Sequence, residues 1–315
     1  MSIRGGSVAI AEPVVGDQRT PAQRAMDERD WSFGGAWPYA PKWHHTDGVR
    51  LHYVDEGPRD AAPVVMLHGN PTWAFLYRKM IACLGKRGQR TIAPDQLGFG
   101  RSDKPHRLRE YSLARHCRLF DALLDELALD DVILVAHDWG GPVAMSWASR
   151  HPERVSGLVL LNTFIEPPPS AASVARRILV KGAHRTVHRA IWADPVSGSL
   201  TSEERRAYAA PHPSWDSRTG ILAFEQAHVR GRAVETKAAT AETRAGLDAL
   251  RATPTLIGWG AGDATLAPEL LSELRDTLPG AQVRELDGVG HLVPEAAAEL
   301  FCDAILELRN GRRVQ

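Results

Sequence analysis

An aspartate occupies the place at which a sharp strand-to-helix turn commonly carries a nucleophilic serine. Residues Val135–Pro142 read Val-Ala-His-Asp-Trp-Gly-Gly-Pro, with Asp138 flanked two positions away by Ala136 and Gly140, which is the spacing of the G-x-S-x-G motif. The apolar run Val132–Val135 predicts a buried strand, and the small and apolar residues after Gly140 predict a helix. We therefore expect Asp138 to project from a strained turn at the end of a strand.

The carboxylate of Asp138 suits a saturated carbon as its target. It is an anion at neutral pH, so it can displace a leaving group directly and form an alkyl ester of the protein. Release of the product then requires water, a base that activates the water, and donors for the oxyanion that forms on the aspartyl carbonyl. The alternative is that Asp138 only caps a helix beginning near Gly141, as Asp often does. The motifs around it favour the nucleophile.

A second segment could supply donors for an anion. Leu67–Trp73 follows the strand-like run Pro63–Met66, and in sites of this kind such a loop gives one oxyanion N–H while the residue after the nucleophile gives the other. Here these would be the backbone amides of Asn70 and Trp139, whose side chains also carry N–H donors for a departing halide. Alternatively, Asn70 only forms a turn and Trp139 only packs in the core. With Asp138 between them, the anion site is favoured.

The general base is expected to be His291. It is one of thirteen histidines, so its position in the chain has to single it out. It lies in the glycine-containing loop Asp287–Glu295, after the strand-like run Gln282–Leu286 and before a C-terminal helix, where it can reach a turn at the sheet edge. His137 should point to the opposite face of its strand from the nucleophile. We interpret His137 and His68 as structural.

An acid must orient the base and stabilise its charged form. Asp263 comes shortly after the strand-like run Thr255–Ile257, which is a common place for this residue. The competitor is Glu166, a few residues after the strand-like run Gly157–Leu161, but Asn162 occupies the position directly after that run. We expect Asp263 to be the acid and retain Glu166 as the alternative.

Three segments together resemble a known family: His68–Trp73, Pro94–Pro105 and His137–Gly141. They resemble the haloalkane dehalogenases of the α/β-hydrolase superfamily, and the resemblance runs from about Tyr39 to Leu308. It implies an α/β-hydrolase fold with a mostly parallel, eight-stranded sheet, flanking helices and an inserted helical cap. The alternation of strand-like and helical stretches along the chain also predicts a mostly parallel sheet with helices on both faces.

The resemblance also implies a role for each candidate residue. In that family the aspartate attacks the carbon that bears the halogen, the histidine activates water against the ester, and the tryptophan binds the halide. Carried over, these are Asp138, His291 and Trp139. Asn70 becomes the second halide donor, and Asp263 the orienting acid. The implied partners are a small apolar organic substrate and a halide ion, with no metal and no cofactor.

The leading hypothesis is therefore hydrolytic dehalogenation of haloalkanes. The pairing of Asn70 with Asp263 resembles a branch of the family that is similar to bacterial β-lactone decarboxylases, which form olefins. The segments Arg206–Pro211 and Ser214–Arg218 also resemble that branch. Because these decarboxylases use the same aspartate, histidine and acid, β-lactone decarboxylation stays open as the alternative.

Three further hypotheses fit the sequence less well. Epoxide hydrolases normally use two cap tyrosines as O–H donors, whereas Tyr208 is the only tyrosine between Phe164 and Leu250. Fluoroacetate dehalogenases carry arginines beside the nucleophile, where this chain has Trp139. A hydrolase fold that only binds a ligand would not need the five residues expected at the site.

The chain of 315 residues fits one large domain with an insertion. We expect residues 1–30 to be a flexible extension, residues 31–163 and 245–315 to form the main domain, and residues 164–244 to form a helical cap. Three aromatic residues of the cap either line the substrate pocket or pack the cap onto the main domain: Trp192, Trp215 and Phe224.

Composition gives no support for nucleic-acid or membrane partners. Acidic and basic residues balance at 38 each, so no overall field favours a polyanion, and no apolar run approaches the roughly 18 residues of a membrane span. The cysteines are three in number and widely spaced, which disfavours disulfides and favours a cytoplasmic location. We expect a monomer or a weak homo-oligomer.

Overall fold

The computed structural model describes residues 21–167, 194–226 and 232–311. The chain divides into two units, residues 1–30 and 31–315. Helix α1 (Pro21–Asp27) is the described element of the first unit, and every other element belongs to the second. Trp192, one of the expected pocket residues, lies outside the described residues.

A single eight-stranded sheet organises the second unit, with the order β1-β2-β4-β3-β5-β6-β7-β8. The pairs β1 with β2 and β2 with β4 are antiparallel, and the remaining pairs are parallel. This confirms the mostly parallel sheet expected from the sequence. The strands are β1 (Lys42–Thr46), β2 (Val49–Glu56), β3 (Pro63–Leu67), β4 (Arg90–Pro94), β5 (Val132–Asp138), β6 (Val155–Thr163), β7 (Thr255–Gly260) and β8 (Gln282–Leu286).

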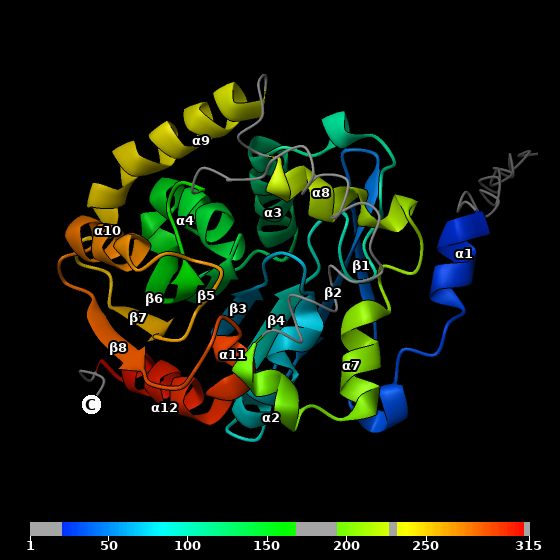
Figure 1. The fold of residues 1–315 in the computed structure, drawn as a ribbon. Coiled ribbons are helices and arrows are strands. Elements are labelled where there is room, and N and C mark those ends of the chain that lie inside the picture. Colours follow the sequence, from blue (N-terminus) through cyan, green and yellow to red (C-terminus); the bar gives the residue numbers. More distant parts are fainter. Residues whose placement is uncertain (1–20, 168–193, 227–231, 312–315) are drawn as a thin grey trace, which may run out of the picture. The chain divides into compact units, whose positions relative to one another are not determined.

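Helices cover both faces of the sheet (Figure 1). Helices α3, α4 and α9 contact one another on one side, and α2 contacts α12 on the other. Every residue of β3, β4 and β5 is consequently buried, which explains the continuous apolar runs Pro63–Leu67 in β3 and Val132–Ala136 in β5. The helices are α2 (Arg78–Gly85), α3 (Leu113–Glu126), α4 (Gly140–Arg150), α7 (Ser202–Ala209), α8 (Thr219–Glu225), α9 (Arg232–Gly246), α10 (Glu269–Thr277), α11 (Val293–Ala296) and α12 (Ala298–Arg309).

The described part of the segment between β6 and β7 contains the helices α7, α8 and α9, with the 3-10 helix η6 (Asp216–Arg218) between α7 and α8. Helix α9 crosses the boundary that we expected between residues 244 and 245. Its C-terminal turn packs on the main domain, because Gly246 lies so close to Ser149 of α4 that a Cβ atom would stand 2.8 Å from the Cβ of Ser149. The end of α9 is thus fixed by α4.

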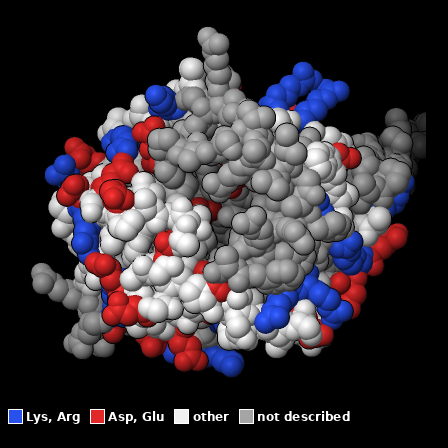
Figure 2. Space-filling view, in the orientation of Figure 1, with Lys and Arg blue, Asp and Glu red and all other residues white. Residues whose placement is uncertain are grey.

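The surface carries charges of both signs. In Figure 2 basic and acidic side chains are interspersed around the rim of the face shown, and the surface is hollowed near the centre, where acidic side chains are visible. Within the described ranges, no helix has the length and apolar character needed to cross a membrane.

A buried ionic cluster joins α7 to the main domain. The carboxylate of Glu295, 2 % exposed, accepts hydrogen bonds from both terminal nitrogens of Arg78, one of them at 2.8 Å, and from the Tyr208 hydroxyl at 2.6 Å. Lys79 Nζ lies 2.6 Å from the same carboxylate, and Arg78 also donates to Glu204 at 2.5 Å. Elements α2, α7 and α11 therefore share one charged centre.

This cluster predicts a stability effect. Glu295→Gln should lower the free energy of unfolding by about 3 kcal/mol, because it removes the carboxylate that neutralises a buried guanidinium. The control is Asp248→Asn, which breaks an exposed ion pair with Arg251 and should cost less than about 0.5 kcal/mol. Urea unfolding of both variants measures the difference. If both variants lost the same small amount of unfolding free energy, the stabilising role given to the Glu295 carboxylate would be wrong.

Candidate active site

Asp138 is the last residue of β5, and its φ of 49° lies in the left-handed region. This conformation costs free energy for a residue other than glycine. The turn at Asp138 fits into the structure because two residues packed against it are glycines and have no side chain. A Cβ atom on Gly69 would collide with the Asp138 carboxylate, and one on Gly140 would collide with the carbonyl of Leu67. The strained turn expected from the sequence is therefore present.

The carboxylate of Asp138 is buried and partly compensated by N–H donors. It is 3 % exposed, and the backbone N–H of Asn70 donates to its Oδ2 atom at 2.7 Å. Burial raises the pKa of Asp138 to about 6, while the charge of His291 and the backbone N–H groups of Asn70 and Trp139 favour the anion. Desolvation outweighs these favourable contacts.

His291 lies between two carboxylates. Its Nδ1 atom is 2.8 Å from Oδ2 of Asp263, and its Nε2 atom is 4.0 Å from Oδ1 of Asp138. Burial disfavours the imidazolium, but the hydrogen bond and charge of Asp263, together with the charges of Asp138 and Asp194, raise the pKa of His291 above its ordinary value. An Nδ1–H that donates to Asp263 leaves Nε2 as the basic nitrogen on the Asp138 side.

Asp263 is held as an anion by several donors. Its Oδ1 atom accepts from the backbone N–H of Thr265 at 2.6 Å, and its Oδ2 atom accepts from the Asn162 amide at 2.6 Å. Burial opposes the charge, but His291 and these donors bring the pKa of Asp263 down to about 2. The structure places Asp263 beside His291, whereas the carboxylate of Glu166 lies 3.9 Å from Arg244.

Asn162 is a supporting residue that the sequence reasoning did not assign. It follows the core of β6, its Oδ1 atom accepts from the N–H of Gly260 at 2.7 Å, and its Nδ2 atom donates to Asp263. It thus ties the ends of β6 and β7 together and holds the carboxylate of Asp263. The sequence contained one indication of such a role, because the polar residue Asn162 directly follows the apolar run Gly157–Leu161.

The two expected halide donors flank Asp138 from different elements. Trp139 packs against Phe224 of α8 and Phe164, with ring centroids 4.5 Å and 5.4 Å away. The Asn70 amide nitrogen lies 3.5 Å from the carbonyl of Ile221, so α8 touches both residues. Helix α8 therefore packs against the two residues that flank Asp138.

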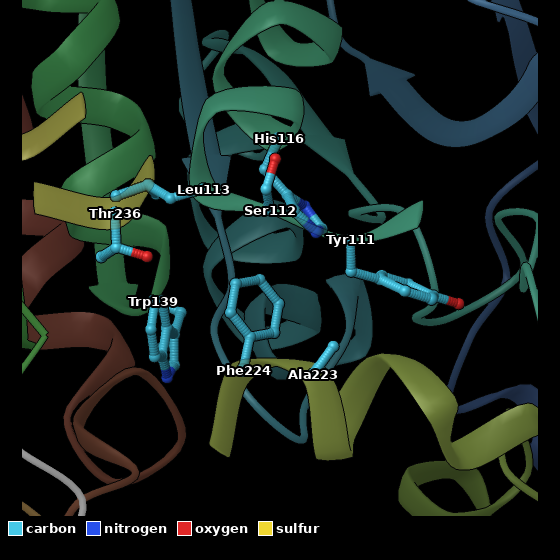
Figure 3. A pocket seen from close by; sticks show the side chains of 8 residues that line it. All are labelled: Tyr111, Ser112, Leu113, His116, Trp139, Ala223, Phe224 and Thr236. Carbon is cyan, nitrogen blue, oxygen red and sulfur yellow. The ribbon is translucent and has the colours of Figure 1, made fainter. Parts of the chain in front are cut away.

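Phe224 also borders a small cavity of about 10 Å³ next to Trp139 (Figure 3). In this view the Trp139 ring faces Phe224, and the indole nitrogen is at the end of the ring turned away from Thr236. Phe224 thus packs on an expected site residue. Trp215 is 46 % exposed, and its place in a substrate pocket stays a prediction.

His137 and His68 occupy structural positions. The Nε2 atom of His137 is 2.9 Å from the carbonyl oxygen of His291, and its ring centroid is 4.6 Å from that of His291. Burial is the main cause that lowers the pKa of His137 to about 3, so this ring is neutral. The Nε2 atom of His68 accepts from the N–H of Gln96 at 3.0 Å. Both rings brace backbone segments of the site.

Comparison with known proteins gives consistent matches. A family model described as the alpha/beta hydrolase fold matches residues 62–297. Among curated relatives, the chain is 34% identical over 275 residues to cis-3-alkyl-4-alkyloxetan-2-one decarboxylase of Shewanella oneidensis, covering 83% of this chain and 86% of the relative. It is 31% identical over 280 residues to haloalkane dehalogenase 2 of Mycobacterium tuberculosis, covering 86% of this chain and 95% of the relative.

A solved structure agrees with these sequence matches. Haloalkane dehalogenase DatA from Agrobacterium tumefaciens C58 matches with a TM-score of 0.74 at 27% identity, covering 86% of this chain and 96% of that chain. The family resemblance inferred from the sequence motifs is thereby confirmed. The chain belongs to the α/β-hydrolase fold family, in the group that includes haloalkane dehalogenases and oxetanone decarboxylases.

Proposed function

We propose that this protein hydrolyses haloalkanes to an alcohol and a halide through a covalent ester on Asp138. The observation that carries the proposal is the asymmetry of this carboxylate. Oδ2 accepts a hydrogen bond from the N–H of Asn70, while Oδ1 is on the side of His291. Oδ1 is therefore the oxygen that bonds to carbon, and Oδ2 becomes the ester carbonyl within reach of its donor.

In the first step, a lone pair of Oδ1 attacks the carbon that bears the halogen, and the carbon–halogen bond breaks with its electron pair leaving on the halide. Trp139 and Asn70 carry side-chain N–H groups suited to an anion. Both contact α8, through Phe224 and the carbonyl of Ile221. We propose that α8 belongs to a cap over the site, formed by residues 164–244, and that Phe224 lines the substrate pocket.

In the second step, His291 removes a proton from water, and the hydroxide attacks the ester carbonyl carbon of Asp138. The N–H of Asn70 stabilises the negative charge that develops on Oδ2, and Asp263 stabilises the imidazolium. Collapse of this intermediate releases the alkoxide, which takes the proton from His291 and leaves as the alcohol. Asp138 is left as the carboxylic acid and loses its proton to solvent, which regenerates the carboxylate. The net products are the alcohol, the halide and one proton, and the balance needs no cofactor.

A second candidate is decarboxylation of a β-lactone to an olefin and carbon dioxide. One observation favours it: a relative named cis-3-alkyl-4-alkyloxetan-2-one decarboxylase is 34% identical over 83% of this chain. An oxetan-2-one is a β-lactone, and the loss of carbon dioxide from its ring leaves the olefin with no further reactant. The pairing of Asn70 with Asp263 fits this candidate as well as the first.

Halide release tests the main proposal. The wild-type protein should release halide from members of a panel of bromo- and iodoalkanes. Asp138→Asn should reduce this rate by about a thousand-fold or more, because the nucleophile is lost. Asp216→Asn, an exposed change in the insertion, serves as the control and should keep the wild-type rate. If the panel releases no halide while a cis-3,4-dialkyl-oxetan-2-one yields olefin and carbon dioxide, the second candidate replaces the first.

The pKa of Asp138 predicts an effect on stability. Its value of about 6 in the folded protein exceeds the ordinary value of 3.8, so the buried carboxylate destabilises the fold above pH 6, and this cost disappears as the pH falls toward 4. Asp138→Asn should therefore raise the free energy of unfolding at pH 8 by up to about 3 kcal/mol. Asn also tolerates a positive φ.

Urea unfolding of wild type and Asp138→Asn at pH 8 and pH 5 measures this effect. The gain should be smaller at pH 5, where the wild-type carboxyl is partly protonated. Asp216→Asn, at an exposed aspartate, controls for the general effect of removing an acidic charge. A gain that is the same at both pH values, or a loss at pH 8, would contradict the destabilising carboxylate.

A further inference from the structure

A third buried acid meets the segment that carries His291. Asp194 precedes the 3-10 helix η5 (Pro195–Ser199) in the insertion and is 6 % exposed. Its Oδ1 atom accepts from the N–H of Val196 at 3.0 Å, and its Oδ2 atom accepts from the N–H of Leu292 at 2.9 Å. One carboxylate thus caps a helix of the insertion and binds the residue directly after His291.

The residue before His291 also faces Asp194. A Cβ atom on Gly290 would lie 2.5 Å from Oδ2 of Asp194 and 2.5 Å from Cδ of Pro195. Gly290 is absent from the positive-φ residues of the chain, so its backbone conformation does not require glycine. Asp194 and Pro195 approach Gly290 so closely that there is no room for a side chain, so this position does require glycine. The segment Gly290–Leu292 is therefore shaped to receive this carboxylate.

Other contacts hold the same segment from the main domain. The His291 carbonyl oxygen lies 2.9 Å from the His137 ring nitrogen and accepts from the N–H of Val293 at 2.9 Å. Among the described residues, the titratable groups that face the His291 ring are Asp138 and His137 at the end of β5, Asp263 after β7, and Asp194. Asp194 is the member of this set that comes from the insertion, and it contributes a negative charge.

We propose that Asp194 is a positioning residue for His291: it holds the Gly290–Leu292 backbone so that the imidazole faces Asp138, and its negative charge favours the imidazolium formed during ester hydrolysis. The proposal rests on the proposed function in that His291 acts there as the base. It makes the insertion part of the machinery that places the base.

The direction of the electrostatic effect follows from the surroundings of His291. Burial lowers the pKa of His291, whereas Asp263, Asp138 and Asp194 raise it. Asp194→Asn keeps an oxygen acceptor for the N–H of Leu292 and removes the charge, so it should lower the pKa of His291. Asp194→Ala removes both the charge and the acceptor, so it should also free the Leu292 backbone.

NMR titration of histidine-labelled protein tests the charge directly, with the His291 signal identified by its loss in His291→Gln. We expect Asp194→Asn to lower the pKa of His291 by about half a unit to one unit. Asp216→Asn, the matched exposed aspartate of the insertion, should leave it unchanged. An unchanged value in Asp194→Asn would overturn the electrostatic part of the proposal.

Hydrogen exchange of the Leu292 amide tests the positioning part. Exchange should be at least about tenfold faster in Asp194→Ala than in Asp194→Asn, since only the alanine variant lacks the acceptor. Gly290→Ala, which keeps the carboxylate but pushes it away, should give the same acceleration. If the Leu292 amide kept its wild-type protection in both Asp194→Ala and Gly290→Ala, the positioning part of the proposal would be overturned.

Single-turnover kinetics connect these effects to the reaction. Asp194→Ala should slow hydrolysis of the Asp138 ester more than its formation, because His291 acts only in hydrolysis. Equal slowing of both steps would contradict the assignment. If the wild-type protein turns over neither haloalkane nor β-lactone, the proposed function fails, but the titration and the exchange experiment still decide the role of Asp194.

Discussion

The structure depends on holding one carboxylate as an anion in a place that water barely reaches. Asp138 is 3 % exposed, and burial raises its pKa to about 6. A desolvated anion is a stronger nucleophile than a hydrated one, but it needs fixed donors in place of water. The backbone N–H of Asn70 supplies one at 2.7 Å. The positive φ of the turn and the glycines around it allow this approach.

The segment that carries His291 is held by contacts from three directions. Asp263 orients the His291 ring from the end of β7, His137 braces its carbonyl from β5, and Asp194 binds the next residue from the insertion. Tyr208 adds a link from the insertion to Glu295, four residues beyond the base. The helical insertion is thus bonded to the segment that carries His291, in addition to packing against Trp139.

Much of this arrangement was readable in the sequence because it depends on local patterns. Apolar runs predicted the buried parallel strands, and the residue types at the ends of those strands predicted Asp138, Asp263 and His291. The choice of Asp263 over Glu166 followed from their distances to the preceding strand-like runs, because Asn162 and not Glu166 directly follows its run. The structure pairs Asp263 with His291 and places Glu166 near Arg244.

The partners of the supporting residues were not predictable from local patterns. Asn162 and Asp194 reach partners about a hundred positions away in the chain. The apolar run before Asn162 marks this residue as lying at a strand end, but it does not identify Asp263 as its partner. Helix α9 runs to Gly246, across the boundary expected between residues 244 and 245, and Gly246 lies close to Ser149 of α4. These features follow from tertiary packing, which a single sequence does not display.

The most direct test of the account is a single turnover of a bromoalkane in heavy-oxygen water with protein in excess. Water attacks the carbonyl carbon of the Asp138 ester in the proposed reaction, so the heavy oxygen should appear in the Asp138 carboxylate, and the alcohol should carry the ordinary oxygen of the aspartate. Mass analysis of the Asp138 peptide and of the alcohol reports both. Heavy oxygen in the alcohol with none in the peptide would contradict the covalent mechanism.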